Sequence, residues 1–316
     1  MTMTSSLPRQ LGPYRLVRRL GHGGMCEVFL ARAFGASGFE KDVAVKVLLP
    51  DLAGDATYER LLITEARLGA RLSHRNLVQV HDLGVEEGVY FVRLDYVDGH
   101  DLHTLCRAER PRPEVALCIA EEVALALDYL HHFVDETGVV VGLVHRDISP
   151  ANVLLSTSGE VKLADFGAAK ATRRADTTQA NVHKGKYAYM SPEQVENRDL
   201  DHRSDLFSLG VTLAELLSGR RPFEGDGPLE TMERIRSNAL PDLSAIKPAF
   251  RPIVDRCLQK RPEDRYRDAG ALYRAIHRLR GQLPPTGPPQ LASWVRRARA
   301  SLEGGSPEAA EPQDGF

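Results

Sequence analysis

Apolar and polar residues alternate with a period of two along the first third of the chain, which predicts β-strands. The expected strands cover residues 14–20, 27–31, 42–49, 78–83 and 89–96. Between them, residues 58–72 carry apolar side chains at helical spacing instead. These elements predict a small β-rich lobe with one main helix over residues 11–97.

Beyond residue 98 the apolar positions follow a helical period. The expected helices cover residues 102–107, 113–132, 203–218, 229–237, 250–259 and 269–280. They predict a larger, mainly α lobe over residues 98–280. The expected fold class is therefore α+β, in two lobes.

Both ends of the chain are expected to lie outside this fold. Residues 1–10 are predicted to be a flexible N-terminus. Residues 281–316 begin with a proline-rich stretch typical of a linker and end in a small, polar stretch typical of disorder. Between these two stretches, residues 294–302 predict a short basic helix, which could be solvated surface or could dock on the body or on a partner.

Composition indicates a globular protein without a global charge. Hydrophobic residues make up 42% of the chain, charged residues 27%, and the formal net charge is −2. This balance gives no reason to expect nucleic acid or an anionic membrane as a partner. The four cysteines form no CxxC pair, and no apolar stretch suits a signal peptide or a membrane span, so a cytoplasmic location is expected.

The strongest chemical signal is His145-Arg146-Asp147 with Asn152 five residues after the aspartate, followed by Asp165-Phe166-Gly167. Phosphoryl transfer needs a carboxylate that orients the attacking hydroxyl and oxygen ligands for the magnesium that accompanies a nucleotide. Asp147 could supply the first, and Asn152 and Asp165 the second. In this order the motifs resemble the catalytic core of eukaryotic-like Ser/Thr protein kinases, nearest in wording to bacterial members, over roughly residues 11–280.

The resemblance implies a two-lobed protein kinase fold that binds ATP with Mg²⁺, or Mn²⁺ as an alternative, between the lobes. Lys46 would hold the phosphates and be fixed by Glu65. Leu94 would be the gatekeeper, and the backbone of Asp95 and Val97 would bind the adenine. The remaining nucleotide contacts implied are Leu20, Gly21, Gly23, Gly24, Val28, Ala44 and Leu154.

Two further ties are implied in the second lobe. Ser191-Pro192-Glu193 resembles the Ala-Pro-Glu motif, and Arg265 fits the arginine that pairs with its glutamate. Asp205 resembles the helix aspartate that holds the backbone of the catalytic loop.

Three positions depart from the family pattern. Cys26 stands where the third glycine of the loop is expected, and a redox role is weighed against a buried, inert thiol. Ser149 replaces the usual lysine two residues after Asp147, and Lys186 replaces a threonine expected to face it. One interpretation is a reciprocal exchange in which Lys186 restores the missing cation to the catalytic site. The other is that Lys186 points into solvent and the enzyme is slow or inactive.

Arg146 precedes the catalytic aspartate, so a phosphate on the following segment could pair with it and order the loop. The candidate acceptors are Thr172, Thr177 and Thr178.

The leading hypothesis is an enzyme that transfers the γ-phosphate of Mg-ATP to Ser/Thr hydroxyls of protein substrates, with self-association for autophosphorylation left open. The competing hypothesis is a pseudokinase that binds nucleotide and acts as a scaffold. A small-molecule kinase is a third option, which the Ser-Pro-Glu motif disfavours.

Overall fold

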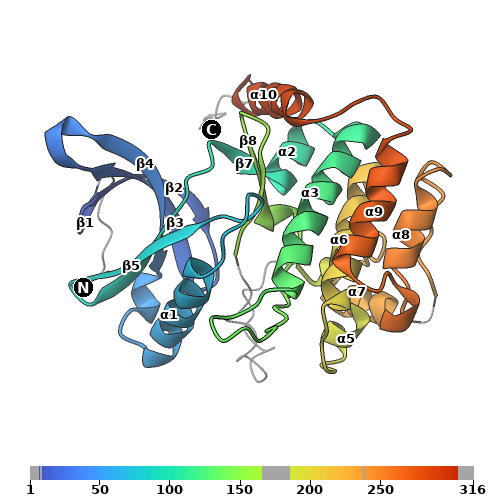
Figure 1. Cartoon of the computed structure of the whole chain (residues 1–316), viewed down its shortest axis with the longest axis horizontal. Coiled ribbons are helices and arrows are strands. Elements are labelled where there is room, and N and C mark those ends of the chain that lie inside the picture. Colours follow the sequence, from blue (N-terminus) through green and yellow to red (C-terminus); the bar gives the residue numbers. More distant parts are fainter. Residues whose placement is uncertain (1–6, 8, 166–185, 238, 305–316) are drawn as a thin grey trace, which may run out of the picture.

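The computed structural model describes residues 7, 9–165, 186–237 and 239–304, which form a β-rich lobe and a helical lobe side by side (Figure 1). The β-rich lobe, called the N-lobe below, holds one antiparallel sheet of six strands in the order β1-β2-β3-β4-β6-β5. Its elements are β1 (Arg9–Leu11), β2 (Tyr14–His22), β3 (Cys26–Phe34), β4 (Glu40–Leu48), helix α1 (Ala56–Ala70), β5 (Val80–Glu86) and β6 (Val89–Leu94). The predicted N-lobe with one main helix is confirmed.

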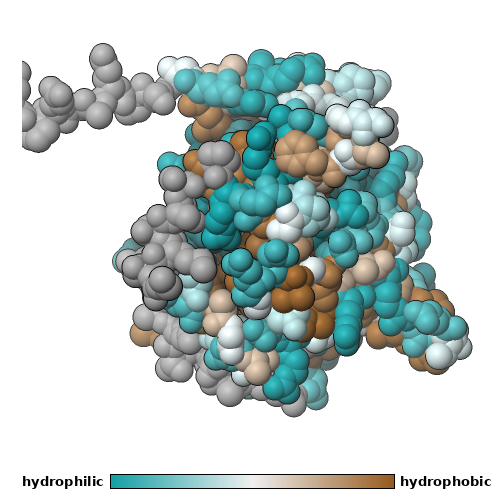
Figure 2. All heavy atoms as spheres, turned by 90° about the vertical axis from the view of Figure 1, so that its left-hand side faces the viewer, coloured by the Kyte–Doolittle hydropathy of each residue, from teal (hydrophilic) through white to brown (hydrophobic). Residues whose placement is uncertain are grey.

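The alternation of β4 explains how this sheet packs, because successive side chains of a strand point to opposite faces. Val43, Val45 and Val47 belong to a cluster on one face that also contains Tyr14 and Phe91. The other face carries a second cluster, in which α1 packs against the sheet. Viewed from the N-lobe end, hydrophilic residues cover much of the surface around smaller apolar patches (Figure 2).

Helices dominate the other lobe, called the C-lobe. Its helices are α2 (Leu102–Ala108), α3 (Pro113–His131), α5 (Pro192–Val195), α6 (Arg203–Ser218), α7 (Pro228–Arg236), α8 (Arg251–Cys257), α9 (Ala269–Arg280) and α10 (Pro288–Gly304). A small sheet in the order β7-β8-β9 joins Gly99–Asp101, Val153–Ser156 and Val161–Leu163. The mainly α second lobe is likewise confirmed.

Two helices form the centre of the C-lobe because they are apolar on nearly every side. α3 and α6 bury most of their residues, including Leu117, Leu127, Phe207 and Leu213. A helix that is apolar all round is stable only inside a core. The C-lobe core is therefore built around α3 and α6, which precede and follow Asp147 in the sequence.

The C-terminal helix corrects the sequence-based prediction. α10 starts at Pro288 rather than at residue 294, and it packs on α2, β7 and β8. Leu291, Trp294, Val295 and Ala298 are buried in the same core as α3 and α6. Their i, i+3, i+4, i+7 spacing is that of one apolar helix face, so the helix docks on the body instead of lying in solvent.

The N-terminal boundary also shifts slightly. Arg9 and Gln10, placed in the flexible N-terminus, pair with β2 as part of β1.

Candidate active site

Strand register places the expected nucleotide-binding side chains of the N-lobe on one face of the sheet. Val28 on β3 is opposite Lys46 on β4, and Ala44 on β4 is opposite Leu94 on β6. Directly opposed residues of antiparallel strands project to the same face. Val28, Ala44, Lys46 and Leu94 therefore line the face that α1 also covers.

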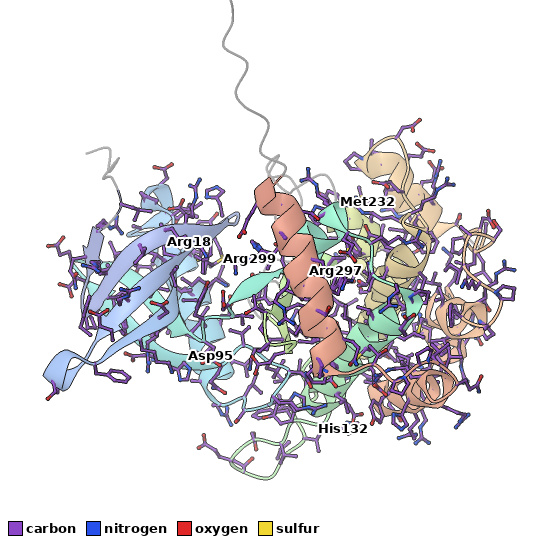
Figure 3. All side chains as sticks on the ribbon, turned by 90° about the horizontal axis from the view of Figure 1, so that it is seen from above. Arg18, Asp95, His132, Met232, Arg297 and Arg299 are labelled. Carbon is purple, nitrogen blue, oxygen red and sulfur yellow. The ribbon has the colours of Figure 1, made fainter. Side chains whose placement is uncertain are left out.

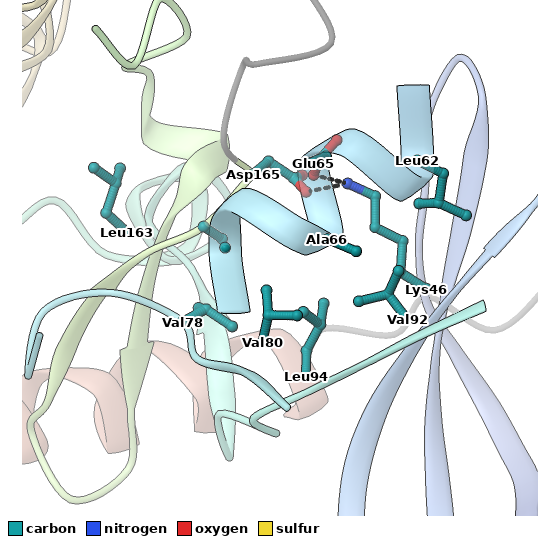
Figure 4. A pocket seen from close by; sticks show the side chains of 12 residues that line it. Lys46, Leu62, Glu65, Ala66, Val78, Val80, Val92, Leu94, Leu163 and Asp165 are labelled. Carbon is teal, nitrogen blue, oxygen red and sulfur yellow. Dashed lines mark hydrogen bonds and ion pairs between the residues drawn. The ribbon is translucent and has the colours of Figure 1, made fainter. Parts of the chain in front are cut away.

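Lys46 joins three separate parts of the chain. Its Nζ donates to Glu65 Oε1 of α1 at 2.7 Å and to Asp165 Oδ1, two residues beyond β9, at 2.8 Å (Figure 4). Burial alone would lower the pKa of the lysine, but the charges of Asp165 and Glu65 outweigh it and raise the pKa above its ordinary value. Lys46 is therefore a fixed cation at the junction of the lobes, and the predicted pair with Glu65 is present.

A small cavity of about 50 Å³ lies behind this ion pair. Its apolar lining includes Leu62, Val80, Val92 and Leu94. This lining is mainly apolar, so the Lys46 ammonium has surroundings of low polarity on that side, which strengthens its attraction to the two carboxylates.

Asp205 of α6 holds the backbone of the loop around His145, Arg146 and Asp147, which is the expected catalytic loop. Its Oδ2 accepts from the His145 N–H and its Oδ1 from the Arg146 N–H, both at 2.8 Å. His131 of α3 places Nε2 at 2.9 Å from the same carboxylate. The predicted tie from Asp205 is present, whereas His131 was not foreseen because nothing in its local sequence separates it from an ordinary helix-end histidine.

The loop that follows brings Asp147 and Asn152 together. The short 3₁₀ helix Pro150–Asn152 turns the chain so that Asn152 Nδ2 donates to the Asp147 carbonyl at 2.7 Å. The Ala164 N–H donates to the Asn152 carbonyl at 2.8 Å, which places Asp165 next to the same loop. Asp147, Asn152 and Asp165, predicted as one catalytic group, lie on two segments joined by these bonds.

Two residues of this site have backbone angles that favour glycine. Arg146 has φ of 67° and Asp165 has φ of 57°. Such conformations cost non-glycine residues about 1–3 kcal/mol each and persist only where the surroundings impose them. Asp205 holds Arg146 through its N–H, and Gln194 Nε2 donates to its carbonyl at 2.9 Å. Gln194 was not foreseen either.

The glycine-rich turn lies between β2 and β3. Gly21 is opposite Val28, and the Gly23 N–H donates to the Cys26 carbonyl at 2.8 Å. The Cys26 side chain is buried beside α1, and burial raises the pKa of its thiol to about 12. The thiolate is the reactive form, so this burial and the raised pKa of the thiol favour the buried, inert interpretation of Cys26.

Residues 95–98, called the hinge below, connect β6 to β7. The Asp95 N–H donates to the Gln79 carbonyl at 3.0 Å. Leu94 ends β6, and Asp95 and Val97 follow it in the hinge. Leu154 lies on β8 opposite Asp101. Leu20 and Gly24 belong to β2 and to the glycine-rich turn.

A second buried ion pair lies in the C-lobe. Arg265 donates to both oxygens of Glu193 at 2.7 and 2.9 Å, and Ser204 Oγ donates to Glu193 Oε1 at 2.6 Å. Burial raises the pKa of the Glu193 carboxyl, but the bonds and charge from Arg265 outweigh it, so the pKa lies below its ordinary value. The predicted Glu193 to Arg265 tie is present.

Several predicted residues fall outside the described part of the chain. Phe166, Gly167, Thr172, Thr177 and Thr178 belong to the segment 166–185, and of Lys186 only the backbone, in the 3₁₀ helix Lys186–Tyr189, is described. Ser149 is buried. The exchange between Ser149 and Lys186 stays a prediction.

The ligand set suits magnesium that arrives with a nucleotide. Among the described residues, no group of three or more His, Cys, Asp or Glu could hold a metal ion. Asp165 and Asn152 supply carboxylate and amide oxygens, and Mg²⁺ commonly takes only one or two protein carboxylates, its other ligands being water and substrate phosphates. Asn152 and Asp165 therefore fit a magnesium ion that binds together with a nucleotide.

No helix within the described ranges is long and apolar enough to cross a membrane.

Comparisons with known proteins agree with this geometry. The family description "Protein kinase domain" matches residues 14–274. The chain is 41% identical over 274 residues to the tyrosine-protein kinase MasK of Myxococcus xanthus, covering 84% of this chain and 42% of MasK. It is 33% identical over 313 residues to the serine/threonine-protein kinase PknH of Mycobacterium tuberculosis, covering 98% of this chain and 48% of PknH.

The chain thus spans about half the length of the curated relatives it matches. Among solved structures it resembles the PknI kinase domain of Mycobacterium tuberculosis, with a TM-score of 0.62 and 31% identity over 88% of this chain and all of that domain. The family match covers well over half of the sequence, and the fold and the Lys46 to Glu65 pair agree with it. The chain belongs to the protein kinase family.

Proposed function

We propose that this chain is an ATP-dependent protein kinase that transfers the γ-phosphate to Ser/Thr hydroxyls of protein substrates. The observation that carries the proposal is the double contact of Lys46 with Glu65 and Asp165. This contact brings Lys46, the proposed phosphate-binding cation, next to Asp165, the proposed metal-binding carboxylate, at the junction of the lobes. A pseudokinase that acts only as a scaffold would not require these two groups to meet.

Each residue has a distinct role in the transfer. Asp147 orients the acceptor hydroxyl and takes its proton, and Lys46, held by Glu65, positions the α- and β-phosphates. Asn152 and Asp165 would hold Mg²⁺, which supplies charge neutralisation on the phosphates when bound. The glycine-rich turn and Val28, Ala44 and Leu154 enclose the nucleotide.

The direct test compares wild type with Asp147→Asn in a radiolabelled ATP assay on a generic protein substrate. Transfer by wild type and its loss in the variant is expected. Equal background in both proteins, with nucleotide still bound, would instead support the pseudokinase alternative.

Ser149 and Lys186 belong to this proposal as an exchanged pair, with Lys186 supplying the cation that position 149 lacks. Lys186→Ala should then lose most activity, whereas the double variant Ser149→Lys/Lys186→Thr should retain it. Full activity of Lys186→Ala together with an inactive double variant would contradict the exchange.

Phosphorylation of Thr172, Thr177 or Thr178 is proposed to create a partner for the Arg146 guanidinium. Autophosphorylation between molecules would require two copies to meet. Mass spectrometry after incubation with Mg-ATP should find phosphate on this segment, and an unmodified segment in a fully active enzyme would exclude the idea.

We place the reaction in the cytoplasm, where ATP is available and where free cysteines, as all four are here, stay reduced.

Tyrosine is a second candidate acceptor, and a specific observation favours it. MasK, at 41% identity, is described as a tyrosine kinase, and Ser149 leaves a smaller side chain beside Asp147 than the lysine usual in Ser/Thr kinases. Phosphoamino-acid analysis of the product decides between the two acceptor classes.

A further inference from the structure

The polar side chains of the hinge, Asp95, Tyr96 and Asp98, are bound by residues from several elements of the fold. His81 Nε2 of β5 lies 2.6 Å from Asp95 Oδ1, and Arg18 Nη2 of β2 donates to the Tyr96 hydroxyl at 3.3 Å. Asp98, the last hinge residue, has Thr157 Oγ1 at 3.0 Å from one carboxylate oxygen and an Arg299 guanidinium nitrogen at 3.5 Å from the other. The hinge is thus anchored from both lobes.

Arg299 belongs to α10, so the C-terminal helix takes part in this anchoring. Figure 3 shows Arg299 on the flank of α10 that faces the N-lobe, toward Arg18. A second arginine of the helix, Arg296, donates to the Thr157 carbonyl at 3.0 Å, while the Thr157 N–H donates to the Asp98 carbonyl at 2.7 Å. Helix and hinge therefore share Thr157 as well as the direct ion pair.

α10, which carries these contacts, is docked on the C-lobe by a buried apolar face. Its side chains Leu291, Trp294 and Val295 are buried, and Trp294 Nε1 donates to the Glu109 carbonyl at 3.2 Å. Burial of several large apolar side chains stabilises the docked helix by several kcal/mol. The pair of Arg299 with Asp98 is weak by comparison, since the two side chains are 40% and 60% exposed. The helix therefore positions Asp98 rather than the reverse.

We propose that Arg299 is a positioning residue for nucleotide binding, which it supports by holding Asp98 at the end of the hinge. The inference rests on the proposed function, because it assumes that the backbone of Asp95 and Val97 receives the adenine. A hinge fixed in advance loses less conformational freedom when the nucleotide binds. Arg299 thus links the segment after residue 280 to affinity for ATP.

The chain provides a matched control on the same helix. Arg297 is 50% exposed and pairs with Glu109 of the C-lobe at 2.8 Å, away from the hinge. Arg299→Ala and Arg297→Ala each remove one surface ion pair between α10 and the body. Because Arg299 also pairs with Glu303 within the helix, Glu303→Gln controls for that contact.

Steady-state kinetics with Mg-ATP and direct titration with Mg-ADP measure the effect. Arg299→Ala is expected to raise KM for ATP and Kd for ADP about threefold, the size typical of an exposed ion pair, with kcat and the KM for protein substrate unchanged. Arg299→Lys should recover most of the loss, and high salt should reduce the difference from wild type. Arg297→Ala and Glu303→Gln should match wild type in nucleotide affinity.

Equal nucleotide affinity of Arg299→Ala and Arg297→Ala would overturn the inference while leaving the proposed function intact. An equal loss in both variants together with a lower thermal midpoint would also overturn it, since α10 would then act only through stability. A wild-type protein that binds no Mg-ADP in the same titration would instead refute the proposed function, and this outcome is distinct from equal binding by the two variants.

Discussion

Lys46 and Arg265 are both buried cations that bind carboxylates, but their surroundings differ. Arg265 is fully buried, and it donates to Glu193 and to the carbonyls of Gln259, Arg203 and Lys260. Lys46 is 11% exposed, and its partner Asp165 is 51% exposed. Every bond of Arg265 stays within the C-lobe, whereas Lys46 connects β4, α1 and the segment after β9.

The difference separates stability from chemistry. Arg265 presents its donors to a complete set of acceptors, which leaves no place for a ligand. Lys46 is bound by groups that lie at the opening between the lobes, and a phosphate could replace part of that interaction. We therefore expect loss of Arg265 to destabilise the fold and loss of Lys46 to stop the reaction.

The largest expected effect is on catalysis. Lys46→Met should lower kcat/KM about 10³-fold, because a preorganised cation next to the phosphates is removed. Lys41→Met, on the same strand but exposed, is the control and should behave as wild type. Residual activity above about a tenth of wild type would contradict the assigned role.

Removal of Arg265 tests the other half of the comparison. Arg265→Ala should lower the free energy of unfolding by about 3–5 kcal/mol, because it leaves the Glu193 carboxylate buried without its cation. Urea unfolding measures this loss, and Arg261→Ala, which removes an exposed pair with Glu263, should cause no measurable change. If Arg265→Ala does not fold, Ser204→Ala removes one hydrogen bond to Glu193 and should cost about 1–2 kcal/mol. No loss in that variant would show that Glu193 needs no hydrogen-bond donor besides Arg265.

A smaller change sharpens the role of α1. Glu65→Gln keeps an oxygen that can accept from Lys46 but removes the charge, so we expect about a tenfold fall in kcat/KM. Glu59→Gln, nearer the start of the same helix, is the control. Equal kinetics of the two variants would mean that α1 need not be charged at position 65.

The smallest expected effect is the response to acid. The pKa of Glu193 lies below its ordinary value, so its ion pair contributes stability above about pH 4.5 that is lost as the pH falls toward the folded-state pKa. Lys46 has a raised pKa, so its own protonation contributes stability that is fully present below pH 10.5 and is lost as the pH rises above that value. Urea midpoints between about pH 6 and pH 3 should therefore fall less steeply in Glu193→Gln than in wild type. Parallel curves would contradict this origin of the acid sensitivity.

Much of the fold and the assembly of the site could be predicted from sequence. Helices 203–218 and 269–280 have the predicted bounds, because apolar spacing and the ends of each pattern coincide there. Strands β7 and β9 were missed because three residues are too few to show a period. The end of the fold was misplaced because the prolines after Gly281 suggested a linker, although Leu291, Trp294, Val295 and Ala298 carried the signal of a buried face.

The contacts that hold the catalytic loop were harder to foresee. Asp205 was recognised from its motif, but His131 contacts Asp205 itself across 74 residues of sequence, and Gln194 binds Arg146 of the loop across 48 residues. Such contacts depend on how α3 and α5 pack, which local patterns do not encode.

Gly159 leaves room for the start of α10, so a substitution at this glycine would displace the helix without changing the sequence of the helix. Its φ is +91°, and a Cβ built there would lie 2.0 Å from the Pro288 carbonyl oxygen, an atom of the backbone that cannot simply swing aside. One added methyl group, in Gly159→Ala, would therefore push the start of α10 off the β8 to β9 turn. A substitution at residue 159 is therefore a way to undock α10 from outside the helix, because glycine has only a hydrogen where alanine has a methyl group.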